Sequence, residues 1–423
     1  MGLTLAEKLI ARAAGKDEVR PGETLTVRVD LAMMHDSSGP RRIAPILERL
    51  GAKVWDADKI VLVSDHWVPA VDPQSAEILD ITRRWAKANG VKAFYDMVGI
   101  CHVVLPQGGH LRPGMFVVGG DSHSTTGGAF GCYMFGVGST DMAGVLVTGE
   151  TWIKVPESIR LEWTGKLQPG VCAKDINLAL CAHLGLGGAE YRTVEYTGSL
   201  IAELGMEERM TLSNMAAELG AQAGLIAADE TTSSWIRAAG GDPGEPGPWQ
   251  SDDDADYYAT HTFDAGKLEP QVAAPHSPAN AAPASQYKDV TIDQAYIGAC
   301  TGAKLADLRM AAEVLDGRQV ARSTRLLVAP ASRQDMMQAN SEGILGKLMD
   351  AGAIMMPTGC GACAGFGGGV LAEDEVCISS TSRNFQGRMG AQSSKVYLGS
   401  PYAVAAAAVA GEIRDPRDFL NGA

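Results

Sequence analysis

The segments Ile297-Gly-Ala-Cys300-Thr-Gly302 and Pro357-Thr-Gly-Cys360-Gly-Ala-Cys363-Ala-Gly365 place a single cysteine and a Cys-x-x-Cys pair in the last third of the chain. Each follows a short apolar run, residues 295–297 and 353–356, that is typical of a buried strand. Because open α/β sheets carry their sites at the carboxyl ends of strands, we expect the three thiols to meet at one sheet edge. Three converging thiolates can hold iron and leave one iron uncapped.

An uncapped iron is a Lewis acid that can bind a hydroxyl or carboxylate, so the pattern favours catalysis over electron transfer alone. The Cys-x-x-Cys pair also fits half of a zinc site or a thioredoxin-like redox pair. Zinc would need a fourth ligand nearby, and a redox pair usually begins a helix in a small domain. The other cysteines lie in apolar stretches and are expected to be buried thiols: Cys101, Cys132, Cys172, Cys181 and Cys377.

The composition predicts a soluble protein that does not bind nucleic acid or membranes. The chain has 423 residues, enough for two or three domains, and a formal net charge of −14 that disfavours anionic polymers and membrane surfaces as partners. The N-terminal residues lack the apolar core of a signal peptide, and the apolar run 403–410 is too short to span a bilayer. We therefore expect a cytoplasmic protein whose cysteines are thiols or metal ligands.

Strand-like and helix-like segments alternate through most of the chain, which indicates an α/β fold with largely parallel sheets. Thr4 is placed to cap a helix that ends near Gly15, and Gly90 should stop a helix over residues 75–89. Apolar runs predict strands at residues 24–31, 60–64, 115–118, 295–297, 326–328, 353–356 and 376–378.

Residues 240–287 are rich in Pro, Gly, Asp and Ala, a composition typical of a surface excursion and a linker. We therefore expect two intertwined α/β domains in residues 1–288, with no boundary assigned between them. Residues 289–423 should form a C-terminal α/β domain that carries all three candidate cysteine ligands.

Histidines of the N-terminal part lie next to acidic residues and predicted strand ends. Asp65-His66 follows residues 60–64, Asp121-Ser122-His123 follows residues 115–118, and His102 begins another short apolar run. An adjacent aspartate can orient an imidazole and raise its basicity, as a proton shuttle requires. One such histidine alone is more often structural, but their repeated placement favours a shared cleft. The glycine-rich stretch after His123 suits a turn whose N–H groups approach a carboxylate.

Arg383 and Arg388 lie five residues apart in a polar loop just past a predicted strand. Guanidinium groups bind carboxylates through two parallel hydrogen bonds, so the pair could clamp a di- or tricarboxylic acid. Both could instead form surface ion pairs, but their closeness in sequence to the Cys-x-x-Cys loop favours the clamp.

These motifs together resemble the aconitase superfamily over essentially the whole chain, and most closely the large subunits of 3-isopropylmalate dehydratase and homoaconitase. The resemblance is carried by Met34-His35-Asp36, Ser64-Asp-His-Trp-Val-Pro69, Gly120-Asp-Ser-His123, Gly136-Val-Gly-Ser-Thr-Asp141, Trp152-Ile-Lys-Val-Pro156, Arg209-Met-Thr-Leu-Ser-Asn-Met215, Ile297-Gly-Ala-Cys-Thr301, Leu305-Ala-Asp-Leu-Arg-Met-Ala311, Pro330-Ala-Ser-Arg333, Arg383-Asn-Phe-Gln-Gly-Arg388 and Asp415-Pro-Arg-Asp-Phe419.

The resemblance implies a three-domain aconitase-like core of α/β/α domains around a central cleft. It implies a 4Fe-4S cluster held by Cys300, Cys360 and Cys363, and reversible dehydration of a small hydroxy acid by a hydro-lyase. The acidic and basic groups around the open iron would be Asp65, His66, His102, Asp121, His123 and Glu195. The groups that bind substrate would be His35, Ser122, Arg383 and Arg388.

The resemblance also implies a partner. In the family a further swivelling domain carries the serine base and another arginine, and in isopropylmalate-type enzymes that domain is a separate small subunit. The sequence ends just after Phe419 without it. We therefore expect one half of a heteromeric enzyme whose active site is closed by a small swivel-domain subunit.

Three positions depart from the isopropylmalate pattern, namely Gly302 after Cys-Thr, Ser382 before Arg383, and Gly127. They leave the substrate open between 3-isopropylmalate and a dimethylmalate, methylmalate or homoaconitase type. Two other hypotheses are the same fold with a mononuclear metal, and a binding protein without catalysis.

Overall fold

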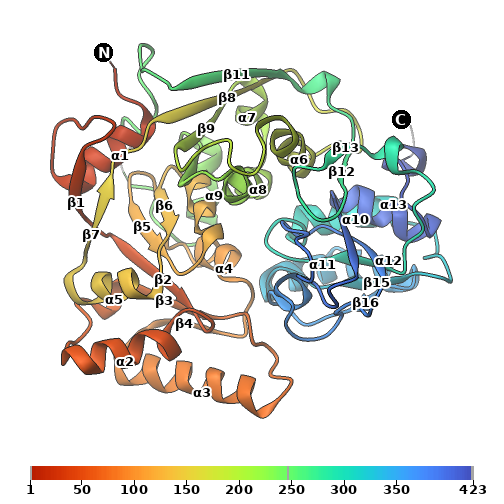
Figure 1. The fold of residues 1–423 in the computed structure, drawn as a ribbon, viewed down its shortest axis with the longest axis horizontal. Helices are drawn as coiled ribbons and strands as arrows, with labels where there is room; N and C mark the ends of the chain where they lie inside the picture. Colours follow the sequence, from red (N-terminus) through yellow and green to blue (C-terminus); the bar gives the residue numbers. More distant parts are fainter. Residues whose placement is uncertain (1, 245–246, 421–423) are drawn as a thin grey trace.

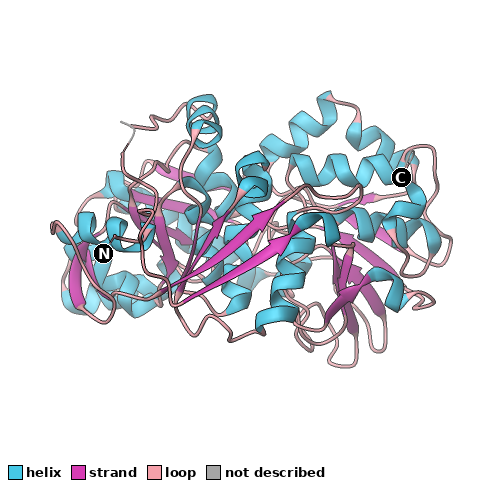
Figure 2. Cartoon of the chain, turned by 90° about the horizontal axis from the view of Figure 1, so that it is seen from above, coloured by secondary structure: helices cyan, strands magenta, loops and turns pink. Residues whose placement is uncertain are grey.

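The computed structural model describes residues 2–244 and 247–420, whose strands form four sheets. Three of these sheets are wholly or largely parallel and are covered by helices, as the alternating sequence pattern predicted. The N-terminal sheet lies at the lower left of Figure 1, the C-terminal sheet lies at the right, and long strands cross the top (Figures 1 and 2).

The N-terminal sheet is parallel, with strand order β4-β3-β2-β5-β6. Its strands are β2 (Leu31–His35), β3 (Ile60–Ser64), β4 (Ala93–Asp96), β5 (Phe116–Gly119) and β6 (Tyr133–Gly136). Alternate residues of one strand belong to different cores, so Met33 and Met34 pack on opposite faces. Burial on both faces explains why these strands are continuous apolar runs in the sequence.

Helices cover both faces of this sheet. They are α1 (Leu5–Ala14), α2 (Pro40–Leu50), α3 (Pro73–Ala88), α4 (Cys101–Gln107), α5 (Ser139–Thr148) and the 3-10 helix η2 (Ser122–Phe130). Thr4 caps α1, and Gly15 ends it in the left-handed conformation, as the sequence predicted. An antiparallel pair, β1 (Thr24–Arg28) and β7 (Glu150–Lys154), lies at the edge of this unit.

The predicted strand at residues 24–31 was wrong, because the structure contains two strands there that belong to different sheets. β1 pairs with β7, whereas β2 pairs with β3 and β5. Asp30 lies between them, and its carboxylate accepts a hydrogen bond from the Phe116 N–H at 2.8 Å. The strand predicted at residues 115–118 is β5, displaced by one residue.

The second parallel sheet has the strand order β10-β9-β8-β11. Its strands are β8 (Ser158–Thr164), β9 (Thr193–Thr197), β10 (Ala223–Leu225) and β11 (Ala259–Asp264). The accompanying helices are α6 (Ala173–Leu184), α7 (Ser199–Glu203), α8 (Met206–Asn214), η3 (Met215–Leu219) and α9 (Glu230–Ala238).

The C-terminal sheet has the strand order β13-β12-β18-β17-β14-β15-β16. Its strands are β12 (Gln271–Ala273), β13 (Ala281–Pro283), β14 (Gln294–Ile297), β15 (Arg325–Val328), β16 (Ile354–Met355), β17 (Val376–Ser379) and β18 (Lys395–Gly399). Strands β14 to β18 are mutually parallel, and the predicted strands 295–297, 326–328, 353–356 and 376–378 correspond to β14, β15, β16 and β17. The helices are α10 (Leu305–Leu315), α11 (Arg333–Ser341), α12 (Ile344–Asp350), α13 (Pro401–Ala410) and the 3-10 helices η6 (Gly361–Ala364) and η7 (Pro416–Phe419).

Residues 240–287 are not only a surface excursion. β11 adds a parallel edge strand to the second sheet, while β12 and β13 add antiparallel edge strands to the C-terminal sheet. Further 3-10 helices, η4 (Ala265–Lys267) and η5 (Ala284–Tyr287), lie beside them. Proline and glycine are tolerated in edge strands, so composition alone concealed these strands. The segment therefore ties two sheets together.

The N-terminal and C-terminal sheets meet through backbone contacts. Ile100 N–H donates to the Ala331 carbonyl at 2.8 Å, and Arg333 N–H donates to the Val98 carbonyl at 2.7 Å. One hydrophobic cluster includes residues of both parts, such as Val117 and Ile297. The loops that follow β4 and β15 are thereby fixed against each other.

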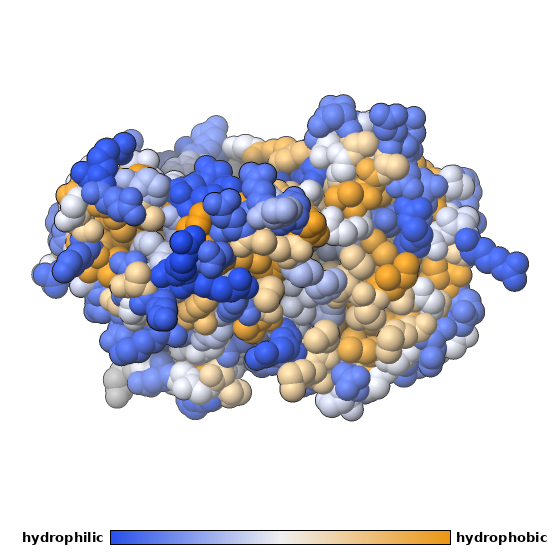
Figure 3. All heavy atoms as spheres, turned by 90° about the horizontal axis from the view of Figure 1, so that it is seen from below, coloured by the Kyte–Doolittle hydropathy of each residue, from blue (hydrophilic) through white to orange (hydrophobic). Residues whose placement is uncertain are grey.

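The surface mixes hydrophilic residues with smaller hydrophobic patches (Figure 3). Among the described residues, no helix combines the length and the apolar character needed to cross a bilayer. Trp152, Tyr191 and Met337 are among the most exposed large hydrophobic side chains.

Gly128 should be essential for the packing of η2 against β10. A Cβ atom at this position would lie 1.9 Å from the Gly224 carbonyl oxygen, which belongs to backbone and cannot rotate away. We expect Gly128→Ala to lower the free energy of unfolding by about 1–3 kcal/mol or more. Chemical denaturation of the metal-free chain measures this change.

Gly144→Ala is the matched control. Gly144 lies within α5, and a Cβ atom there would meet nothing within 4 Å. Alanine should therefore stabilise the chain by roughly 0.5–1 kcal/mol through helix propensity. Equal stability of the Gly128→Ala variant and the unmodified chain would contradict the packing described here.

Candidate active site

Three strands of the N-terminal sheet end at one edge and present polar residues there. β2 ends at His35, β3 is followed directly by Asp65, and β5 is followed after one residue by Asp121. Two groups of potential ligand atoms each lie within 4.8 Å of one another: His35, Asp36, Asp65 and His66 in one group, and Cys101, His102 and Asp121 in the other. The structure thus brings these residues together at the strand ends.

Asp65 and His66 form the most strongly coupled pair. Asp65 is fully buried, and its Oδ1 lies 2.7 Å from His66 Nδ1. Burial opposes the charged imidazole, but the charge of Asp65 overcomes this effect and raises the pKa of His66 to about 9. Burial also opposes the charged carboxylate, yet His66 keeps the pKa of Asp65 below its usual range. The pair is therefore an oriented imidazolium-carboxylate couple.

His35 lies against this couple. Its ring stacks on the His66 ring with centroids 4.1 Å apart. Burial and the positive charge of His66 lower the pKa of His35 to about 4, so it is a neutral imidazole near pH 7. Its Nε2 lies 3.1 Å from the Ser38 hydroxyl and 3.6 Å from Asp121 Oδ2. His35 can therefore accept or donate a hydrogen bond beside the charged pair.

His102 lies in the first turn of α4, six residues after β4, and not at a strand end as predicted. The helix still directs its ring into the cleft, where Nε2 lies 2.8 Å from Asp121 Oδ1. Burial would raise the pKa of Asp121, but the neighbouring His102 and His35 hold it well below its usual range. The two residues form a second imidazole-carboxylate pair.

The glycine-rich stretch after His123 is the 3-10 helix η2, which Asp121 caps by accepting a hydrogen bond from the His123 N–H. Its glycines serve packing: a Cβ at Gly127 would lie 2.5 Å from Met134 Sδ. The sequence predicted that N–H groups of this stretch approach a carboxylate. In the structure the carboxylate that the His123 N–H contacts is that of Asp121, within the chain itself.

His123 lies between Glu218 and Ser382. Its Nε2 is 3.0 Å from Glu218 Oε1 and 3.1 Å from the Ser382 hydroxyl. Arg383 donates from Nε to the same Glu218 oxygen at 2.6 Å. Burial lowers the pKa of His123, and Glu218 is kept ionised because His123 and Arg383 outweigh its burial and lower its pKa. Glu218 thus joins a histidine of the N-terminal part to an arginine of the C-terminal part.

Glu218, which the sequence analysis missed, occupies the place expected for Glu195. Glu195 is buried within β9, where it accepts hydrogen bonds from the Ser251 and Tyr257 hydroxyl groups. The structure gives it no contact with the other predicted site residues. Glu218 comes three residues after the motif 209–215, so extending that motif would have found it.

The three predicted cysteine ligands approach the same edge from the C-terminal part. Cys300 follows β14 by three residues, Cys360 follows β16 by five, and Cys363 lies in η6. Burial and the charge of Cys363 raise the pKa of Cys300 to about 12. Burial also raises the pKa of Cys360, and the charges of Cys363 and Cys300 contribute to this increase. The thiols are therefore close enough for their charges to interact.

The cysteine loops are joined to the histidine cluster by hydrogen bonds. Cys360 N–H donates to the Asp65 carbonyl at 2.9 Å. Asn214 donates from Nδ2 both to Cys300 Sγ at 3.1 Å and to the Thr126 hydroxyl at 2.8 Å. Gly359 has φ +145°, and a side chain there would contact the Asp65 carbonyl, so glycine permits this approach.

The donor set fits a polynuclear iron cluster better than one metal ion. A tetrahedral ion with Zn–S bonds of about 2.3 Å would hold its sulfurs about 3.8 Å apart. Among the residues that the structure describes, the three thiols do not form a group whose atoms all lie within 4.8 Å. Thiols bound to different irons of one cluster can be farther apart, as each needs to reach only its own iron.

Several buried polar atoms around this cleft have no hydrogen-bond partner within the described ranges. They include His102 Nδ1, Asn214 Oδ1, Glu218 Oε2 and Arg388 Nε. His102 Nε2 also lacks hydrogen-bond geometry, although it lies 2.8 Å from Asp121 Oδ1. Buried polar atoms usually have a partner, so unpaired ones in a cleft mark a place for a ligand or water. Arg388 is half-buried, whereas Ser122 is exposed and lines a cavity of about 360 Å³.

The two remaining departures from the isopropylmalate pattern also have local explanations. A Cβ atom at Gly302 would lie 2.2 Å from the Ser380 hydroxyl, so Ser380 fills the space of a side chain there. Ser382 keeps a polar contact with His123. The five other cysteines are buried free thiols, as predicted.

Comparison with known proteins gives a consistent result. The family described as "Aconitase family (aconitate hydratase)" matches residues 7–288 and 280–411. The chain is 45% identical to "3-isopropylmalate dehydratase large subunit 1" of Methanopyrus kandleri, over 99% of this chain and 100% of that protein. It is also 45% identical to "Probable methanogen homoaconitase large subunit" of Methanothermobacter thermautotrophicus, over 98% of each chain.

The fold is also similar to a solved structure. The crystal structure of the holo form of Thermococcus kodakaraensis aconitase X matches with a TM-score of 0.52 and 13% identity. The match covers 85% of this chain and 84% of that one, and at this identity it supports the fold alone. Together with the family match over most of the sequence, these findings show that the chain belongs to the aconitase family.

Proposed function

We propose that this chain is the large, catalytic subunit of an iron-sulfur hydro-lyase that reversibly dehydrates a small hydroxy di- or tricarboxylic acid. The observation that carries the proposal is the meeting of three cysteine thiols with two imidazole-carboxylate pairs at one sheet edge. Membership in the aconitase family supports the same reaction class. Relatives at 42–45% identity are named 3-isopropylmalate dehydratase large subunits.

The proposed cofactor is a 4Fe-4S cluster held by Cys300, Cys360 and Cys363. When bound, such a cluster would supply a Lewis-acidic iron for the hydroxyl and a carboxylate of the substrate. Asn214 would orient Cys300 through its hydrogen bond to the sulfur. The Asp65 carbonyl would hold the Cys360 loop in place.

The imidazole-carboxylate pairs are suited to hold and move protons. His102, oriented by Asp121 at 2.8 Å, can protonate a leaving hydroxyl from a fixed direction. His66 is kept in its charged form by Asp65 and can donate a hydrogen bond to developing negative charge. The neutral His35 ring, stacked on His66 and in contact with the Ser38 hydroxyl, can accept or donate a hydrogen bond beside this pair.

Arg383, Arg388 and Ser122 are the proposed groups that bind substrate carboxylate. Arg383 uses Nε for Glu218, which leaves its terminal nitrogens free to form a fork with a carboxylate. Arg388 has an unpaired buried Nε, consistent with a ligand in that place. His123, held by Glu218 and Ser382, would complete this side of the pocket.

A small subunit with a swivel domain is the proposed partner, because relatives at 42–45% identity are named large subunits. Two cavities of about 360 and 720 Å³ share Gly136, Val137, Tyr191 and Gln222, and the smaller one reaches Asp121. The larger one is lined by the exposed Trp152. We propose that the partner covers these cavities next to Asp121 and Ser122.

The substrate is proposed to be of the 3-isopropylmalate type, with homoaconitate, dimethylmalate and methylmalate types as alternatives. Relatives at equal identity carry the dehydratase and the homoaconitase names. Turnover assays with each acid and a matching small subunit decide between them. A protein without catalysis is less well supported, because both imidazole-carboxylate pairs are intact.

The proposed domain division keeps residues 1–288 and 289–423 as units. β12 and β13 lie in the first unit by sequence but belong to the C-terminal sheet. We further propose a cytoplasmic location, since all eight cysteines are free thiols and suit a reducing compartment.

Replacement of any one of the three cysteines should abolish the cluster. Anaerobically prepared protein should contain about four irons and four sulfides per chain, whereas Cys300→Ser, Cys360→Ser and Cys363→Ser should contain little of either. Iron and sulfide analysis with visible absorbance measures this content. Cys377→Ser is the control, because Cys377 is buried within β17 and should not affect the cluster. Full iron content in the triple variant would rule out the ligand assignment.

Glu218 and Glu195 provide a direct comparison. Glu218→Gln weakens the contacts that align His123 and Arg383, and a small misplacement of reacting groups costs about a hundredfold in rate. We expect such a loss in kcat/KM for Glu218→Gln when the cluster is loaded and the partner is present. Glu195→Gln changes a carboxylate that contacts Ser251 and Tyr257, so its rate should stay near that of the unmodified enzyme. The reverse result would place Glu195 in the site.

The chain alone should be nearly inactive and should gain activity when a small subunit is added. A positioned base contributes typically ~10² to 10⁴ in rate, so its absence should be evident in an assay. Trp152→Ala should raise the small-subunit concentration needed for half-maximal activity by roughly tenfold or more, as aromatic interface anchors do. Met337→Ala, an equally exposed side chain on α11, should have no such effect. Full turnover by the single chain would show that the base lies within it.

A further inference from the structure

Lys174 is a buried lysine whose ammonium group contacts carbonyl and hydroxyl oxygens and no carboxylate of the described residues. It lies at the start of α6 and is 1% exposed. Its Nζ donates to the Thr381 carbonyl at 2.6 Å, to the Ser380 carbonyl at 3.2 Å and to the Thr301 hydroxyl at 3.5 Å. In residues 2–244 and 247–420 no ion pair is formed by this ammonium group.

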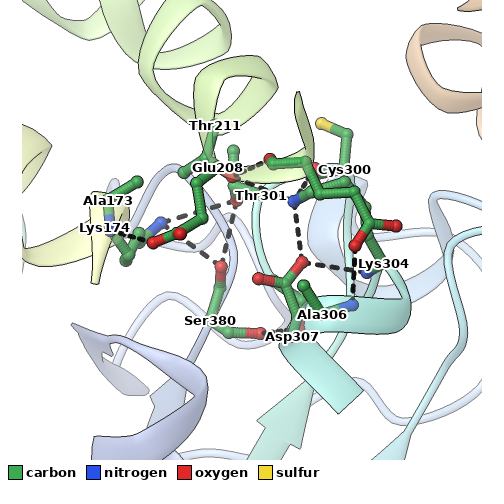
Figure 4. Close-up of polar contacts among 12 residues, drawn as sticks. Ala173, Lys174, Glu208, Thr211, Cys300, Thr301, Lys304, Ala306, Asp307 and Ser380 are labelled. Carbon is green, nitrogen blue, oxygen red and sulfur yellow. Dashed lines mark hydrogen bonds and ion pairs between the residues drawn. The ribbon is translucent and has the colours of Figure 1, made fainter. Parts of the chain in front are cut away.

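Lys304 lies on the other side of the loop that carries Cys300 and Thr301 (Figure 4). Unlike Lys174, it forms an ion pair, as buried lysines usually do. It is equally buried, but its Nζ lies 2.7 Å from Asp307 Oδ2. It also donates to the Cys300 carbonyl at 3.0 Å and to the Thr211 hydroxyl at 2.9 Å. Of these two buried lysines, only Lys304 has a counterion.

The position of Lys174 is unfavourable for a cation in two ways. Burial disfavours the charged form and lowers the pKa of Lys174 to about 8. The first turn of a helix also carries partial positive charge, so a cation there is repelled. A buried charge is rarely kept without a compensating partner, because removing it from water is costly.

Several of the negative charges that act on Lys174 belong to the site. Those that favour its charged form are Glu218, Cys363 and Cys300, in that order, followed by Cys181. Glu218 already contacts His123 and Arg383. The neighbouring Asp175 carboxylate also acts on Lys174, but it accepts hydrogen bonds from the Cys172 and Gln271 N–H groups instead of contacting the ammonium group. The cysteine thiolates would add further negative charge near Lys174 once they bind metal. Thr301, which contacts Lys174, directly follows Cys300 in the sequence.

We propose that Lys174 is a positioning residue whose charge offsets the negative charge of the thiolate-bound cluster, and that it sets how tightly and at what reduction potential the cluster is held. This inference rests on the proposed function, because it requires the three cysteines to bind a cluster. Cluster potentials depend on net charge and on the groups around the ligands. Contacts beyond the direct ligands typically change metal affinity by about 10- to 100-fold.

The test compares Lys174→Met, Lys174→Gln and Lys174→Arg in the full chain after anaerobic reconstitution. Iron release to a chelator should be roughly tenfold or more faster in the Met and Gln variants than in the unmodified chain. The midpoint potential of the cluster should shift to more negative values in both variants, since a nearby positive charge favours the reduced form. The Arg variant should keep a potential close to that of the unmodified chain.

Thermal unfolding of the metal-free chain separates charge from structure. Without a cluster Lys174 has no counterion, so the metal-free Gln variant should be at least as stable as the unmodified chain. Lys304→Gln leaves Asp307 unpaired and should be less stable both with and without the cluster. Lys166→Gln, an exposed lysine near the start of α6, controls for the loss of one positive charge.

Two results would overturn the proposal. One is an unchanged potential and iron-release rate in both the Met and the Gln variant. The other is that Gln behaves like the unmodified chain while Met does not, which would mean that Lys174 acts as a hydrogen-bond donor alone. Failure of the unmodified chain to take up iron would instead contradict the proposed function.

Discussion

The buried carboxylate of Asp65 is the constraint on which the site depends. One oxygen accepts from His66, the other accepts from the Cys101 N–H at 2.7 Å, and the residue's carbonyl accepts from the Cys360 N–H. These three bonds tie the end of β3 to the helix that carries His102 and to the loop of the Cys-x-x-Cys pair. An unpaired buried carboxylate would be costly, so every part of this arrangement must be in place together.

Much of the site could be predicted from the sequence because its residues lie at strand ends. Asp65, Asp121 and Cys300 follow short apolar runs, and parallel strands bring their carboxyl ends to one edge. Glu218 could not be found in this way. It lies in η3, after a helix, and enters the site only because Arg383 and His123 converge on it from distant segments. No strand end marks such long-range contacts, and the only local signal for Glu218 is its place three residues after the motif 209–215.

The fold was predicted less completely where edge strands are short. β12 and β13 each have three residues within a Pro- and Ala-rich segment, and the sheet that they join decides that β12 pairs with β18 and β13 with β12. The break between β1 and β2 depends on Asp30, whose carboxylate binds the β5 backbone. In both cases the determining partner lies far away in the sequence, and residue type alone could not identify it.

The charges of the cleft are balanced only in part by the chain itself. Asp65 with His66 and Asp121 with His102 are compensated pairs, and Lys304 has Asp307. Lys174 has no such partner, while Glu218 Oε2 and Arg388 Nε make no hydrogen bond in the described part of the chain. Unsatisfied buried groups of opposite sign around three thiols agree with the proposed cluster and the proposed anionic substrate. Stability and function then oppose each other here, since each group that prepares the site for these ligands destabilises the chain without them.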